Sequence, residues 1–140
     1  LIKRDPASYQ EEFIQQWHHF QSCLGILNLN PLSPPAGLPE LISFVAHCAP
    51  LYKQHCGGLA EQLMQLLGER ADSLSPELRR SLVQALILLR SRGMLALDRL
   101  VRLLFGLFRV RDKALREQLF GGIVGEIRRA NRPHLNNGLN

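Results

Sequence analysis

The sequence predicts an all-α fold of about six helices. Two observations point to this class. Apolar residues recur every three or four positions along most of the chain, and no stretch alternates apolar and polar residues as a half-buried strand does. The composition, 46% hydrophobic and 21% charged in 140 residues, is that of a folded globular chain. No apolar run reaches the roughly 18 to 20 residues of a membrane-spanning helix, so no membrane is expected as a partner.

Caps, prolines and glycines set the limits of the first three helices. Asp5 is placed to cap the first helix, and Pro6 can occupy its first position, where a missing N–H costs nothing. The proline-rich segment "NLNPLSPPAGLP" ends that helix, and Pro50 ends the next one. Gly57 and Gly58 precede the third. These helices are expected over approximately residues 6–29, 37–49 and 58–69.

Similar signals delimit the last three helices. Ser75, Pro76 and Glu77 combine an N-cap, a first-position proline and an acidic group near the positive end of a helix. Gly93 ends this helix, and Asp112 caps the last one. These helices are expected over approximately residues 76–93, 96–110 and 112–131.

The helices repeat along the chain. Shifting the segment that begins at Leu78 by 37 residues aligns five apolar pairs and one arginine pair. The aligned pairs are Leu78 with Leu115, Arg79 with Arg116, Leu82 with Leu119, Val83 with Phe120, Leu86 with Ile123 and Ile87 with Val124. A period of about 40 residues built of two helices is typical of HEAT and armadillo repeats. The sequence therefore predicts a right-handed α-solenoid of HEAT/armadillo-like helix pairs.

The two ends of the chain suggest that it is part of a longer protein. It begins "LIKRDP", without a methionine, and its last predicted helix is followed by no polar capping repeat. We therefore expect residues 1–140 to form a single helical-repeat domain cut from the N-terminal region of a longer helical protein.

Charge is distributed unevenly along the chain. Residues 1–69 contain three basic and six acidic groups, whereas residues 70–132 contain fourteen basic and six acidic groups. Thirteen of those fourteen are arginines. A half with this excess can attract phosphate or an acidic protein surface, although a solvated basic helix face is an equally ordinary explanation.

Residues 47–56, "HCAPLYKQHC", raise the question of metal binding or catalysis. His47, Cys48, His55 and Cys56 are residue types that zinc accepts, but adjacent His-Cys pairs on a helix point in different directions. A cysteine nucleophile also needs a base, an orienting group and an oxyanion hole, and this spacing supplies none of them. We expect no catalytic residue, metal, cofactor or small-molecule substrate. Three cysteines, an odd number, indicate free thiols in a reducing compartment.

The glycine pairs do not indicate a phosphate-binding loop. Gly57-Gly58 and Gly121-Gly122 lack the Lys-Ser/Thr that a nucleotide-binding loop requires. Gly106, Gly121, Gly122 and Gly125 are instead expected to permit close contacts between helices.

The arginine-rich half supplies the candidate binding residues. Arg99, Arg102 and Arg109 fall on one side of their predicted helix, and arginine binds phosphate or carboxylate through two parallel hydrogen bonds. No aromatic residues are interleaved with these arginines, which argues against stacking of single-stranded bases. The predicted basic face, for RNA or a ribonucleoprotein, consists of Arg79, Arg90, Arg99, Arg102, Arg109, Lys113, Arg116, Arg128 and Arg129.

Several blocks of sequence, in order, resemble a known family. "LIKRDPASYQEEF", "QQWHHFQS", "LSPELRRSLVQALILLR" and "FRVRDKALREQLFGGIVGEIRRAN" are similar to the N-terminal region of the Sda proteins, named for severe depolymerisation of actin. The residues that match best are Lys3 to Pro6, Leu86 to Arg90, and Asp112, Lys113, Leu115 and Arg116. The loop "PLSPPAGLP" and the segment "FGGIVGE" depart from the family pattern.

The resemblance implies a function for the chain. It implies a non-enzymatic helical-repeat factor of the nucleus and nucleolus that assists assembly and export of the large ribosomal subunit, with protein transport and actin cytoskeleton organisation as linked processes. The implied partner is the pre-ribosomal large-subunit particle, with its ribosomal RNA and assembly proteins, bound by a monomeric module. The alternative is a protein-only adaptor or scaffold for acidic peptides or helices. An enzyme built on Cys48 or Cys56 is the remotest interpretation.

Overall fold

The computed structural model describes residues 4–131, and this part of the chain is helical without any strand. The α-helices are α1 (Gln10–Leu29), α2 (Leu38–Cys48), α3 (Lys53–Cys56), α4 (Leu59–Arg70), α5 (Pro76–Ser91), α6 (Leu97–Gly106) and α7 (Lys113–Ala130). Short 3-10 helices occur at η1 (Pro6–Tyr9), η2 (Ala49–Leu51), η3 (Ala71–Ser73) and η4 (Leu107–Arg109). The predicted all-α class is confirmed. Across residues 4–131, no helix is both long and apolar enough to span a membrane.

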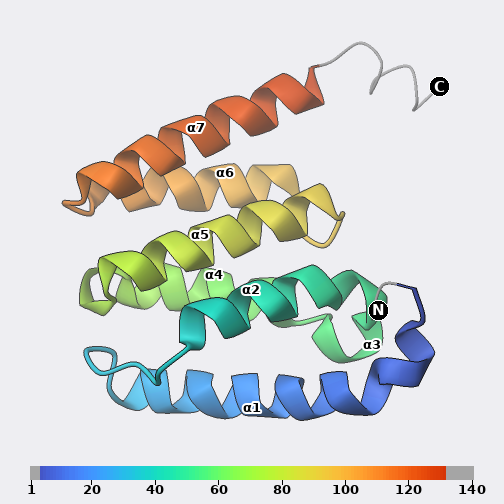
Figure 1. Ribbon diagram of the computed structural model, residues 1–140. Coiled ribbons are helices and arrows are strands. Elements are labelled where there is room, and N and C mark those ends of the chain that lie inside the picture. The colour runs from blue at the N-terminus through green and yellow to red at the C-terminus, as the bar shows by residue number, and fades with distance from the viewer. Residues whose placement is uncertain (1–3, 132–140) are drawn as a thin grey trace.

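The six long helices form three antiparallel pairs stacked on one another (Figure 1). The pairs are α1 with α2, α4 with α5, and α6 with α7. Successive pairs pack through α2, α5 and α7 on one side of the stack and through α4 and α6 on the other. This arrangement is the predicted α-solenoid of helix pairs, in which each pair buries its apolar stripes against its neighbours.

Capping side chains begin the helices where the sequence indicated. The Ser75 hydroxyl accepts a hydrogen bond from the amide of Leu78 at 3.2 Å, and the Asp112 carboxylate accepts one from Leu115 at 3.0 Å. At the end of α5, Gly93 has a φ of 77°, which allows the next amide to bond back to the helix. The predicted bounds hold within a few residues. Two of the predicted helices tighten into 3-10 helices at one end. The start of 6–29 is η1, and the last part of 96–110 is η4 after Gly106.

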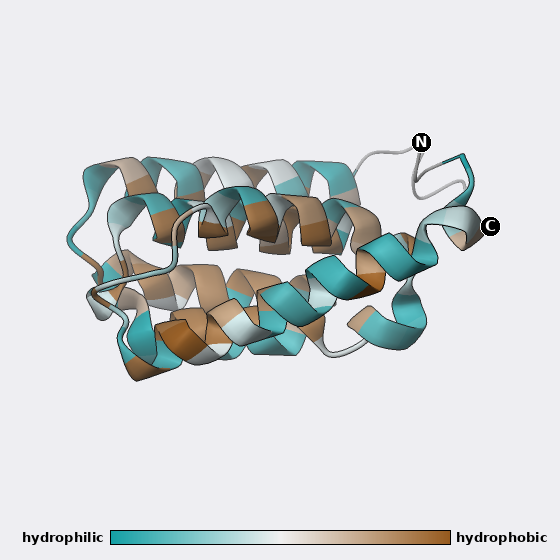
Figure 2. Cartoon of the chain, turned by 60° about the horizontal axis from the view of Figure 1, so that its bottom comes forward, coloured by the Kyte–Doolittle hydropathy of each residue, from teal (hydrophilic) through white to brown (hydrophobic). Residues whose placement is uncertain are grey.

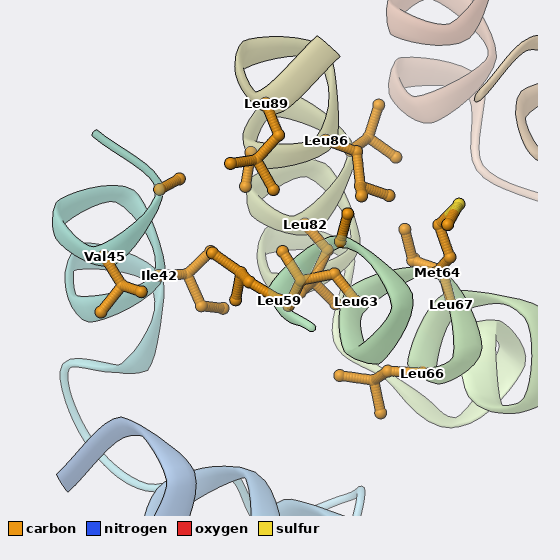
Figure 3. Close-up of a cluster of buried hydrophobic side chains, with 14 of the residues drawn as sticks. Ile42, Val45, Leu59, Leu63, Met64, Leu66, Leu67, Leu82, Leu86 and Leu89 are labelled. Carbon is orange, nitrogen blue, oxygen red and sulfur yellow. The ribbon is translucent and has the colours of Figure 1, made fainter. Parts of the chain in front are cut away.

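The apolar core runs continuously between the two sides of the stack. Figure 2 shows apolar residues on the inward surfaces of the helices and polar residues facing outward. Figure 3 shows the central cluster, in which side chains of α2, α4 and α5 meet. Three leucines of the repeat alignment, Leu82, Leu86 and Leu119, are each 0% exposed.

The 37-residue alignment separates two kinds of position. Leu82 and its equivalent Leu119 are buried alike, and both belong to the apolar core. Val83 is 0% exposed, whereas its equivalent Phe120 is 66% exposed. Among residues 4–131, α7 packs mainly against α5, α6 and η4, and Phe120 on α7 is exposed in this structure.

Glycine is needed for close helix packing at one of the four predicted positions. A Cβ added to Gly122 would lie 2.9 Å from Cδ1 of Ile87 on α5, which is closer than such atoms approach. Gly106 and Gly121 have nothing within 4 Å of an added Cβ, and Gly125 has only the guanidinium of Arg129 at 3.9 Å. The prediction was therefore wrong for these three, which face open space or a flexible side chain.

Candidate nucleic-acid interface

The nine predicted basic residues lie on α5, α6, η4 and α7, and seven of them are exposed. Arg79 does not belong to an accessible face, because its exposed fraction is only 7%. Arg90 is half-buried, and its Nε atom is shut off from solvent without a hydrogen-bond partner among the described residues. The sequence placed Arg79 on one basic face with the other eight residues. In the structure its side chain is instead buried against Asp112, the residue that caps α7.

Arg79 is a structural residue that joins two repeats. Its Nη2 donates to a carboxylate oxygen of Asp112 at 2.9 Å, and its Nη1 donates to the carbonyls of Ala71 and Leu74 at 3.1 and 2.7 Å. The hydrogen bond from the amide of Leu115 and the bond from Arg79 hold the pKa of Asp112 below its usual range. Asp112 therefore caps α7 and neutralises a buried cation at the same time.

Two of the three arginines on α6 and η4 form ion pairs with the preceding repeat. The guanidinium of Arg99 pairs with Glu61 on α4. That of Arg109 pairs with Asp72 of η3 at 2.9 Å. The hydrogen bond from Arg99 lowers the pKa of Glu61. These links join residues 38 and 37 positions apart, which is the repeat spacing found in the sequence. Arg102 is exposed, and its side chain has no partner within residues 4–131.

The remaining predicted residues lie on α7. Lys113 and Arg128 are exposed, and their side chains contact no acidic group of the described chain. Arg116 is exposed as well, and its Nε donates to the carbonyl of Val110 at 3.4 Å. Arg129 pairs with the buried carboxylate of Glu126, one helical turn earlier. Of the nine predicted residues, the cations most available for a partner are thus Arg102, Lys113, Arg116 and Arg128.

Sequence reasoning missed further residues of this surface. Arg80 and Arg111 are accessible, with 41% of the Arg80 side chain exposed, yet neither was among the predicted residues. Phe105 is 59% exposed and lies on α6 between Arg102 and Arg109, so the prediction that no aromatic residue is interleaved was wrong. Its position one turn from each arginine was the available signal.

The cysteine and histidine residues of 47–56 do not converge on a site. Cys48 and Cys56 are buried, whereas His47 is exposed and hydrogen-bonded through Nδ1 to the carbonyl of Ser43 at 2.8 Å. Burial raises the pKa of the Cys56 thiol to about 12, so it carries almost no thiolate at neutral pH. Residues 4–131 contain no group of three or more His, Cys, Asp or Glu side chains arranged to hold a metal ion.

Comparison with known proteins identifies the family. The family described as "SDA1, HEAT repeat" matches residues 44–140, a range that begins within α2 and includes the two following helix pairs. The chain belongs to the SDA1 family. The match also confirms the HEAT-type repeat and the resemblance seen in the sequence blocks.

Members of the SDA1 family from distant organisms align over the whole chain. The chain is 41% identical to Protein SDA1 homolog of Xenopus laevis over 140 residues and 38% identical to that of Dictyostelium discoideum over 140 residues. It is 32% identical to Protein sda1 of Schizosaccharomyces pombe over 141 residues. Each alignment covers 100% of this chain but only 20%, 18% and 20% of the respective relative. The chain thus spans about a fifth of the length of these curated relatives.

Proposed function

We propose that this chain is a non-enzymatic helical-repeat module that docks on pre-ribosomal particles during assembly and nuclear export of the large ribosomal subunit. Its partners are ribosomal RNA and assembly proteins, and its place is the nucleus and nucleolus. Membership of the SDA1 family and the helical-repeat fold support this proposal. The observation that carries it is the set of exposed cations on α6 and α7 without acidic partners in the described chain.

Those cations suit a ribonucleoprotein partner for a physical reason. An ion pair within the chain already neutralises much of an arginine's charge. Arg102 and Arg128 have no such pair within residues 4–131, so their charge is available to a partner. Neutralising phosphate groups releases counterions, which favours binding without any sequence-specific contact. The rigid stack holds the two helices that carry these residues against each other, so no folding cost is added on binding.

Sedimentation of nucleolar extracts tests the proposal. The tagged chain should sediment with precursors of the large subunit and be released as salt is raised, because the contacts are electrostatic. A variant with Arg102→Glu and Arg128→Glu should sediment with less precursor while keeping its far-UV circular dichroism, since both residues are exposed. A wild-type chain that stays at the top of the gradient at every salt concentration would refute the proposal.

The protein-only adaptor stays a second candidate because of a groove between α2 and α5. The groove has a volume of about 430 Å³, an apolar floor that includes Ala46, Ala85 and Leu88, and a polar edge that includes His47 and Arg80. Such a groove suits a short peptide. Capture of an acidic peptide by this face, together with indifference to RNA, would favour the adaptor over the docking module.

A further inference from the structure

Four accessible cations gather where α6 ends and α7 begins. Arg111, Lys113 and Arg116 surround the start of α7, and Arg80 approaches from α5, its Nη1 3.8 Å from a carboxylate oxygen of Asp112. We call Arg80, Arg111, Lys113 and Arg116 the α7 corner. Residues 109–116 alone contain four basic groups and one acidic group.

The single acidic group within this segment does not neutralise the corner. One oxygen of the Asp112 side chain accepts from the amide of Leu115, and the other lies 2.9 Å from Arg79 Nη2. The charge of Asp112, which is 9% exposed, is therefore largely matched by the buried Arg79. The nearby carboxylates of Glu77 and Glu117 are exposed and form no ion pair with residues 4–131. The corner keeps an excess of positive charge.

Hydrogen bonds hold the corner in place. Arg116 Nε donates to the carbonyl of Val110 at 3.4 Å, which draws this side chain back over the turn before α7. Gln118 Nε2 donates to the carbonyl of Arg80 at 2.9 Å and so ties α7 to α5. The helices that carry these charges, α5 and α7, are consequently held together before a partner binds, which reduces the entropic cost of binding.

The composition of the corner indicates the kind of partner. Stable protein interfaces are anchored by buried aromatic or aliphatic side chains. None of the large exposed hydrophobic residues of the described chain lies at Arg80 or within 109–116, and Phe120 lies one turn further along α7. A nucleic-acid backbone needs no such anchor, because charge neutralisation of its phosphates supplies the affinity.

We infer that the α7 corner binds the phosphate backbone of double-stranded RNA, without regard to base sequence. This inference rests on the proposed function and specifies the chemistry of one contact with the particle. Three of the four residues are arginines, whose planar guanidinium groups can each hold two phosphate oxygens. Lys113 adds a point charge at the first position of α7.

The test compares two triple variants of equal charge. The corner variant carries Arg111→Glu, Lys113→Glu and Arg116→Glu and leaves Arg80 and its approach to Asp112 intact. The control variant carries Arg4→Glu, Lys53→Glu and Arg92→Glu, which are also exposed. The control residues come from the segment before η1, from α3 and from the end of α5, which lie on the right of the view in Figure 1, whereas α7 begins on the left. Circular dichroism checks that both variants are folded.

Binding to two short RNA duplexes of unrelated sequence is then measured as a function of salt. Each phosphate contact changes log K by about 0.9 per tenfold change in salt, so three contacts correspond to about 40-fold between about 50 and 200 mM salt. The wild type and the control variant should bind both duplexes and lose affinity steeply. The corner variant should bind weakly, and its slope of log K against log salt concentration should be smaller by about two to three than that of the wild type. A second variant with glutamine at the same three positions replaces it if the glutamate variant does not fold.

The outcomes separate this inference from the proposed function. Equal salt slopes in the corner and control variants would overturn the corner as an RNA site, even if the wild type sediments with precursor particles. Binding of an acidic peptide but not of RNA would overturn it in favour of a protein partner. A wild-type chain that binds RNA through the corner but never joins precursor particles would refute the proposed function and leave the RNA site standing.

Discussion

Two ion pairs of equal length provide a test of how burial sets the energy of a contact. Arg79 and Asp112 are 2.9 Å apart with side chains 8% and 9% exposed, whereas Arg109 and Asp72 are 2.9 Å apart with side chains 50% and 73% exposed. Serine is the matched replacement for both aspartates. At position 112 it also keeps an N-cap for α7, so the substitution removes the carboxylate that pairs with Arg79 and, at 3.8 Å, with Arg80, and leaves the cap in place.

The two substitutions should differ severalfold in their cost. Asp112→Ser leaves Arg79 buried without its counter-charge, which typically costs about 3 to 5 kcal/mol. The hydrogen bonds from Arg79 to two carbonyls survive, so we expect the lower end, about 3 kcal/mol. Asp72→Ser removes an exposed pair and should cost less than about 1 kcal/mol.

Urea unfolding followed by far-UV circular dichroism measures both values. With a slope of about 2 kcal/mol per molar urea, Asp112→Ser should lower the midpoint by about 1.5 M and Asp72→Ser by less than about 0.5 M. Adding Arg79→Met to Asp112→Ser should recover part of the loss, because no unpaired charge stays buried. Midpoint shifts of equal size for the two serine variants would show that burial does not control these pairs.

Three further outcomes are expected. Leu82→Ala or Leu119→Ala should each lower the free energy of unfolding by about 2 to 5 kcal/mol, since both side chains are fully buried. A loss of less than about 0.5 kcal/mol for both variants in urea titrations would contradict the repeat alignment. Gly121→Ala should raise the free energy of unfolding by about 0.5 to 1 kcal/mol, because alanine has the higher helix propensity. Gly122→Ala should not raise it, because the new Cβ would meet Ile87 on α5. Equal rises in melting temperature for the two variants would argue against the close contact. The pKa of Asp112 is lowered in the folded chain, so its contribution to stability is present above the unfolded pKa of about 3.9 and is lost as pH falls through the folded pKa. In acid titrations the free energy of unfolding should therefore fall more steeply for the wild type than for Asp112→Ser. Parallel curves would count against this assignment.

The helices, their order and their repeat could be predicted from the sequence. These properties follow from local rules: Ser75 and Asp112 cap helices because their side chains reach free amides two or three residues on, and Gly93 ends α5 because it tolerates a positive φ. Burial of Leu82 and Leu119 was predictable from a spacing of three and four residues. The concentration of arginine in the second half is likewise evident from the order of the residues alone.

The role of each basic residue, in contrast, depends on how the helix pairs pack. Arg79 and Arg116 are equivalent in the repeat, yet Arg79 is buried against Asp112 and Arg116 is exposed, because only Arg79 has another described helix pair packed over it. Arg99 and Arg109 are joined to Glu61 and Asp72 across a repeat boundary. Such pairs join residues 33 to 38 positions apart, and a helical period reports only which residues share a face, not which charge lies opposite in the next repeat.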